Sequence, residues 1–172
     1  MNALFYISAI VAVISTLLVI TRANAVHALL YLIVSLLSIS LIFYLFGAPL
    51  AAILEVIIYA GAIVVLFVFV VMMLNMGPQT LVQEQQWVRR RVWLGPSILG
   101  AILLAELIYI TMAGGGHTTT ARVIGIKAVG LTLFGSYLLG VELASLLLLA
   151  GLIGAYHLGR RKFHRTVSRG TS

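Results

Sequence analysis

The sequence contains no cysteine and no aspartate, and only 9% of its 172 residues are charged. Without thiolates the chain can form no disulfide, and it lacks the usual ligands of iron–sulfur clusters and of most structural zinc sites. A soluble domain carries roughly 25% charged residues, which its water-exposed surface requires. Because 62% of the residues here are hydrophobic, we expect a chain surrounded mostly by lipid, and the missing thiolates place any iron–sulfur chemistry in other chains.

The hydrophobic residues fall into five long runs. A membrane-spanning helix needs about 20 apolar residues, and each run approaches or exceeds that length. A transmembrane β-barrel would show shorter segments of alternating hydrophobicity. The sequence therefore predicts an all-α integral membrane protein, with one five-helix domain over residues 1–158 and a basic tail over residues 159–172. The expected helices cover residues 4–20, 26–46, 50–76, 93–113 and 128–158.

The basic residues, which give a net charge of +7, lie beside the runs and are not interleaved with aromatic residues. Such interleaving is typical of nucleic-acid binding, so we expect no nucleic-acid partner. Basic residues flanking apolar spans mark the cytoplasmic face. Five spans put the termini on opposite faces, and a cytoplasmic C-terminus gives nine basic residues on that side against two, Arg122 and Lys127, on the other. The nine are Arg22, Arg89, Arg90, Arg91, Arg160, Arg161, Lys162, Arg165 and Arg169. We therefore expect the N-terminus outside and the C-terminus in the cytoplasm.

Three glutamates lie within the expected spans, where an ionised side chain costs at least ~2.5–3.5 kcal/mol on insertion scales. Glu142 is at the middle of the fifth run, and Glu55 is one turn inside the third, with Tyr59 four residues later. For these two, a role in a proton path and a role as a protonated acid in one interhelical hydrogen bond are equally supported. For Glu106, which is nearer a span end, the hydrogen-bonded structural role is favoured.

The third run contains Gly61 between small residues, in the stretch from Tyr59 to Ala62. Glycine lowers the cost of departing from regular helix geometry, and bulges concentrate at such places. The alternative is that Gly61 merely allows another helix to approach closely. The residues alone favour this second interpretation slightly.

Parts of the sequence are also compatible with two other classes of function. His27 begins the second run and His157 ends the fifth, and two histidines at a similar depth are able to ligate a haem. Ordinary interfacial histidines explain them more simply. A free-standing transporter is the third class, but no internal repeat typical of many transporters is present.

Four stretches resemble a known family, namely residues 27–32, 55–75, 127–130 and 141–151. They are similar to subunit J of bacterial NADH-quinone oxidoreductase, respiratory complex I. The resemblance covers nearly the whole chain to about Arg160, and the third run is its most specific part. A related antiporter or hydrogenase complex is the nearest alternative, since such machines share helical membrane modules.

The resemblance implies a bacterial inner-membrane subunit with five spans and no redox centre, beside the H, A, K and N subunits. NADH, FMN, iron–sulfur clusters and quinone would be used by other subunits of the holoenzyme. It also implies a π-bulge in the third helix, near Tyr59–Val65, whose relaxation to α-helix gates a hydrated proton path. Glu55, Tyr59, Gly61, Val65 and Glu142 are the expected proton-path and coupling residues. Glu106 has no expected counterpart in the family.

Overall fold

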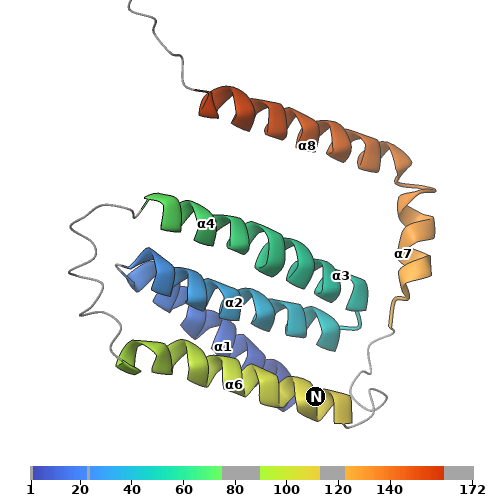
Figure 1. The fold of residues 1–172 in the computed structure, drawn as a ribbon. Coiled ribbons are helices and arrows are strands. Elements are labelled where there is room, and N and C mark those ends of the chain that lie inside the picture. The colour runs from blue at the N-terminus through green and yellow to red at the C-terminus, as the bar shows by residue number, and fades with distance from the viewer. Residues whose placement is uncertain (1, 23, 75–89, 113–122, 161–172) are drawn as a thin grey trace, which may run out of the picture. The chain divides into compact units, whose positions relative to one another are not determined.

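The computed structural model describes residues 2–22, 24–74, 90–112 and 123–160, in which every regular element is a helix (Figure 1). The elements are α1 (Asn2–Thr21), α2 (Ala25–Leu45), α3 (Pro49–Leu54), η1 (Glu55–Ile63), α4 (Val64–Leu74), α6 (Arg90–Met112), α7 (Ile126–Leu133) and α8 (Leu138–Gly159).

Five helical segments in the described residues are long and apolar enough to cross a membrane, which confirms the predicted fold class. The third of these is one continuous helix, Pro49–Leu74, made of α3, the π-helical segment η1 and α4. Residues 75–76 and 113, predicted as span ends, and the tail from residue 161 lie outside the described residues. The orientation of the termini stays a prediction.

The fifth expected run, residues 128–158, is not one helix. It is divided into α7 and α8 by a turn over residues 134–137. The Tyr137 N–H donates to the Thr132 carbonyl at 3.1 Å, and a Cβ at Gly135 would lie 2.6 Å from the Leu131 carbonyl oxygen. Glycine at this position therefore permits a tight backbone approach that an uninterrupted apolar run does not reveal.

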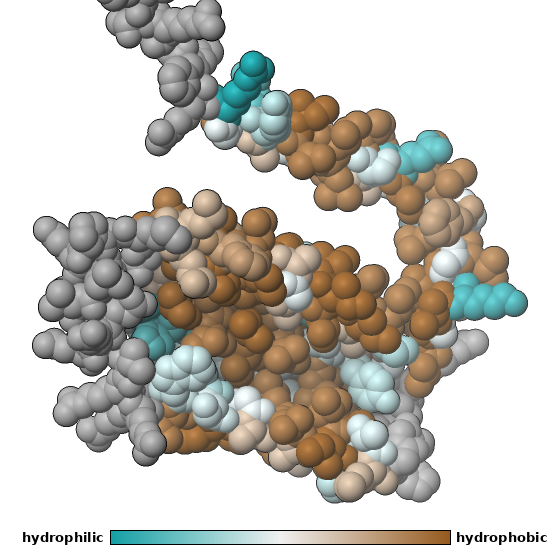
Figure 2. Space-filling view, in the orientation of Figure 1, coloured by the Kyte–Doolittle hydropathy of each residue, from teal (hydrophilic) through white to brown (hydrophobic). Residues whose placement is uncertain are grey.

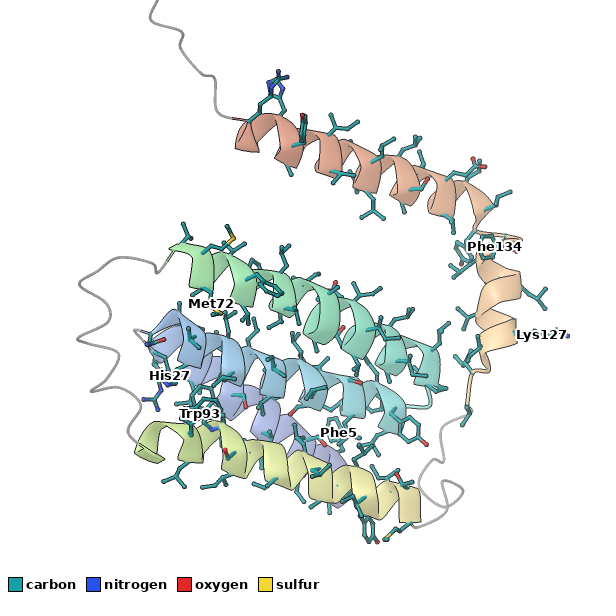
Figure 3. All side chains as sticks on the ribbon, in the orientation of Figure 1. Phe5, His27, Met72, Trp93, Lys127 and Phe134 are labelled. Atoms are coloured by element: carbon teal, nitrogen blue, oxygen red, sulfur yellow. The ribbon has the colours of Figure 1, made fainter. Side chains whose placement is uncertain are left out.

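The chain forms two compact units, Met1–Ile126 and Lys127–Ser172. In the first unit, α1 packs along α2, and α2 also contacts α6 and the third span. Figure 3 places His27 and Trp93 at one end of this unit, where α2 and α6 begin, and Phe5 toward the other. The helix α1 thus runs opposite to α2 and α6. The buried apolar cluster at the centre of the first unit contains Val11, Val34, Leu41, Leu45, Leu103 and Ile110.

Local signals fix how α2 begins and how the third span follows it. The Asn24 side chain accepts hydrogen bonds from the Val26 N–H at 2.9 Å and the His27 N–H at 3.4 Å, which caps the first turn of α2. After α2, Gly47 adopts a positive φ of 77°, and Pro49 occupies the first turn of α3. The Gly47 carbonyl also accepts a hydrogen bond from the Ile124 N–H at 3.0 Å.

The outer surface of the first unit is strongly apolar. Figure 2 shows hydrophobic residues covering most of the face that this unit turns to the viewer. Large side chains of α4 contribute to it, including Leu66, Phe69 and Met73, each at least 60% exposed. Such a surface suits contact with lipid or with neighbouring membrane helices.

Candidate functional site: the π-helical segment of the third span

The segment η1 is a nine-residue π-helix, Glu55–Ile63, inside an otherwise α-helical span. At its end the Val64 N–H donates to the Tyr59 carbonyl, five residues earlier. Well under 1% of residues in globular proteins are π-helical, and π-bulges occur frequently at functional sites. This segment is therefore the leading candidate for a functional site in the described residues.

Gly61 is positioned where the π-helical backbone leaves little room for a side chain. A Cβ added to Gly61 would lie 3.1 Å from the carbonyl oxygen of Val56, five residues earlier. This is closer than most carbon–oxygen contacts, so a larger residue forces the carbonyl to move. By contrast, Gly100 in α6 has open space at the corresponding position. Gly61 thus fits the π-helical geometry specifically.

One face of the third span packs against α2 and the other is open. Ala52 and Ala60 are buried, and Val64 has no exposed surface. Tyr59 is 51% exposed and Val65 is 47% exposed, so these side chains are free to meet other subunits or lipid. The Ser40 hydroxyl of α2 donates to the Ala52 carbonyl at 2.8 Å, one turn before η1 begins. The span is therefore attached to α2 by a polar contact just before the π-helical segment.

The predicted bulge is present, but it lies nearer the N-terminus than the resemblance implied. It covers Glu55–Ile63 rather than Tyr59–Val65. Val65 falls in the first turn of α4. The short distance from a Cβ at Gly61 to the Val56 carbonyl agrees with this position, because the two residues lie on either side of the centre of the segment.

Glu55 and Tyr59 both belong to η1, and Glu55 is partly buried. Within the described part of the chain, no hydrogen bond joins the Glu55 carboxyl to the Tyr59 hydroxyl. Glu142 belongs to the second unit, on α8, where the Ser145 hydroxyl donates to the Glu142 main-chain carbonyl at 2.7 Å. Four of the five expected residues thus share one span.

The remaining polar candidates are distributed as follows. His27 lies in the first turn of α2, in the first unit, and His157 in the last turn of α8, in the second. Glu106 makes the expected interhelical hydrogen bond, since the Ser8 hydroxyl of α1 donates to its carboxyl at 2.9 Å.

Sequence reasoning missed Ser8 and Ser40 as hydrogen-bond partners of Glu106 and of the Ala52 carbonyl. The signal for Ser8 was its seven-residue spacing from Ser15, which puts two hydroxyls on one face of an apolar helix.

The family model described as NADH-ubiquinone/plastoquinone oxidoreductase chain 6 matches residues 15–158. The chain belongs to this family. NADH-quinone oxidoreductase subunit J of Pseudomonas aeruginosa is 57% identical over 166 residues, which cover 94% of this chain and 98% of that protein. The subunit J of Escherichia coli K12 is 54% identical over 162 residues, covering 94% and 88%. That of Buchnera aphidicola subsp. Schizaphis graminum is 52% identical, covering 94% and 99%.

These comparisons confirm the resemblance stated from the sequence. The chain is a multi-pass membrane subunit of NADH-quinone oxidoreductase, and its partners are other subunits of that complex. The part of the chain that the structure describes contains no group of three or more His, Asp or Glu side chains able to hold a metal ion.

Proposed function

We propose that this subunit couples quinone reduction, carried out elsewhere in complex I, to proton translocation through a change of its third span between π-helix and α-helix. The observation that carries the proposal is the nine-residue π-helix at Gly61. An extended π-helix is an unusual conformation with a regular α-helix as its alternative. It therefore suits an element with two states.

The change would alter the packing of the second half of the span. Replacing one five-residue hydrogen-bonded turn by a four-residue turn rotates α4 relative to α3 by about one residue, ~100°. The position that Val64 now fills against α2 would then pass to a neighbour, Ile63 or Val65, both of which are more than one-third exposed. Either Ile63 or Val65 would accordingly become the packing residue of the alternative state.

Glu55 and Tyr59 supply the protonatable groups of the proposed path. Both are carried by η1, so a change of helix type moves them relative to α2. Tyr59 is 51% exposed, so a neighbouring subunit or water would complete the path there. Glu142, on α8, would serve as a polar contact within the helix bundle of the assembled complex.

The wider setting of the proposal follows from the resemblance and the charge distribution. The chain would lie in the bacterial inner membrane with its N-terminus outside, beside the H, A, K and N subunits. Other subunits would bind NADH, FMN, the iron–sulfur clusters and quinone. The high similarity to proteins named NADH-quinone oxidoreductase subunit J supports this setting over an antiporter or hydrogenase complex.

The test is the Gly61→Val enzyme in native membranes, compared with the Gly100→Val enzyme. Gly100 lies within a helix where a Cβ meets nothing within 4 Å, so this control carries the same change without the close contact. We expect Gly61→Val to assemble, as judged by co-purification of the other subunits, and to lose much of its proton pumping per NADH oxidised. Normal pumping by an assembled Gly61→Val enzyme would refute the proposal.

A further inference from the structure

A second acidic site lies between α1, α2 and α6, away from the π-helical segment. Glu106 is 5% exposed and Ser8 is fully buried, and the Ser8 hydroxyl donates to Glu106 Oε2 at 2.9 Å. Glu106 Oε1 has no hydrogen-bond partner among the described residues. An ionised carboxylate with one neutral donor is costly in such surroundings, so the arrangement favours the protonated acid.

The basic residues beside α1 and at the start of α6 are far from Glu106 along the helix axes. Arg22 directly follows α1, whereas Ser8 lies in its first half, so the two are separated by roughly 20 Å of helical rise. Arg90 and Arg91 begin α6, and Glu106 lies near its other end, which again gives a separation of roughly 20 Å. Tyr6, Tyr44 and Tyr109 are exposed and project outward. The titratable side chains on or beside α1 and α2 are Tyr6, Arg22, His27, Tyr31 and Tyr44.

Further buried hydroxyls continue from Ser8 along the seam between α1 and α2. Ser15 and Ser38 have no exposed surface and no hydrogen-bond partner in the described structure. Ser15 shares the face of Ser8, two turns (~10.5 Å) farther along α1. The hydroxyls of Thr16 and Ser35 lie 2.8 Å apart, which fixes the register of the two helices.

This register gives the order of the buried hydroxyls along the axis of α1 and α2. The helices are antiparallel, so Ser38, three residues after Ser35, lies ~4.5 Å nearer to the level of Ser8 than the Thr16–Ser35 pair does. Ser38 also shares its helix face with the core residues Val34 and Leu41. The hydroxyls therefore form a row that leads from Glu106 toward the end of the unit where α1 finishes at Thr21.

Apolar side chains lie in the opposite direction from Glu106. Ile110 and Leu45 are 2% and 5% exposed, and partly buried Phe5 packs against the same cluster. The rings of Phe5 and Phe46 have centroids 5.4 Å apart. The hydroxyl row, and not this apolar end, would thus carry proton exchange with Glu106.

We infer that Glu106, Ser8, Ser38 and Ser15 form a hydrated proton-binding site in the core of α1, α2 and α6. Buried polar groups without a protein partner are where ordered water binds. Glu106 holds the proton; the carboxyl O–H bond breaks as a water in the row accepts that proton, and the carboxylate recovers one by the reverse step. The inference does not depend on the proposed role of η1, because none of its residues belongs to the third span.

The test is infrared difference spectroscopy of the purified, assembled complex at neutral pH. Subtraction of the Glu106→Gln spectrum from that of the unaltered complex should leave the carbonyl band of a neutral carboxylic acid. In heavy water this band should shift, and the Ser15→Ala/Ser38→Ala double variant should show the shift several-fold more slowly. Thr111→Ala removes a hydroxyl of α6 that donates to the Leu107 carbonyl of its own helix, and it should change neither result.

Ser8→Ala provides a second measurement that does not need the Glu106→Gln variant to assemble. Loss of the Ser8 hydrogen bond should shift the frequency of the same band and leave its intensity. Absence of a neutral carboxyl band assignable to Glu106, or exchange that is equally fast without the Ser15 and Ser38 hydroxyls, would overturn the inference.

Discussion

The hydrogen bond from Ser40 to Ala52 offers a direct way to perturb the start of the π-helical segment. In the unaltered protein the buried Ser40 hydroxyl of α2 donates to the Ala52 carbonyl at 2.8 Å. The Ser40→Ala change removes this donor. A buried acceptor left without its partner costs roughly 1–3 kcal/mol. Because a carbonyl with two acceptor sites tolerates partial satisfaction better than a donor does, we expect the lower half of this range, about 1–2 kcal/mol.

A free-energy change of about 1–2 kcal/mol alters the ratio of two states by roughly 5- to 30-fold. If the bond holds α3 against α2 while η1 is π-helical, its loss lowers the population of that state by this factor. The expected result is less proton pumping per NADH oxidised in inverted membrane vesicles. Electron transfer from NADH to an artificial acceptor that bypasses quinone should be unchanged, because the peripheral machinery is untouched.

Two controls separate this effect from a general loss of a hydroxyl. Ser40→Thr keeps a hydroxyl that can donate to Ala52 and should retain most of the pumping. Thr111→Ala removes a hydroxyl that donates to the Leu107 carbonyl within α6, and this variant should behave as the unaltered enzyme. Equal pumping by Ser40→Ala and the unaltered enzyme, at equal amounts of assembled complex, would refute the assignment of this bond to the coupling element.

The other predictions concern packing and capping in the first unit. Val64→Ala removes two methyl groups from a side chain with no exposed surface, and should cost roughly 1–3 kcal/mol and lower pumping at equal assembly. Gly95→Ala places a Cβ against the hydroxyl of buried Tyr31, so the yield of assembled complex should fall, and Tyr31→Phe in the same chain should restore part of it. Asn24→Ala removes the cap of α2 and should lower the thermal stability of the complex by about 0.5–2 kcal/mol, whereas Asn24→Ser should restore most of it. Unchanged assembly in Gly95→Ala, or unchanged thermal stability in Asn24→Ala, would contradict the packing described.

Hydropathy alone predicted the number of spans, because the lipid requires about 20 apolar residues for each crossing. It did not predict the turn between α7 and α8. That turn depends on the close approach of Gly135 to the Leu131 carbonyl, and it leaves the apolar character of the run unchanged. Length and composition thus report which residues lie in lipid, whereas backbone interruptions within an apolar run require the geometry itself.

The candidate site was predicted in part. The residues of the third span drew attention to Glu55, Tyr59 and Gly61, but they did not decide between a bulge and simple packing, and the resemblance placed the bulge up to four residues too far along the chain. The position became clear only from the backbone hydrogen bonds of the structure, which place the π-helix over Glu55–Ile63. The pairing of Ser8 with Glu106 also required the structure, because the partner of a buried acid depends on which helices pack together.

The hydrogen bond from the Ile124 N–H to the Gly47 carbonyl has a consequence for tolerance to mutation. Both groups belong to the main chain, so the contact between the segment following α6 and the turn preceding the third span is independent of the side chain at position 124. Any residue with a main-chain N–H can occupy that position and preserve the link, and proline alone removes the donor. The geometry of the turn that leads into the π-helical span can therefore persist while the sequence of this connection diverges freely.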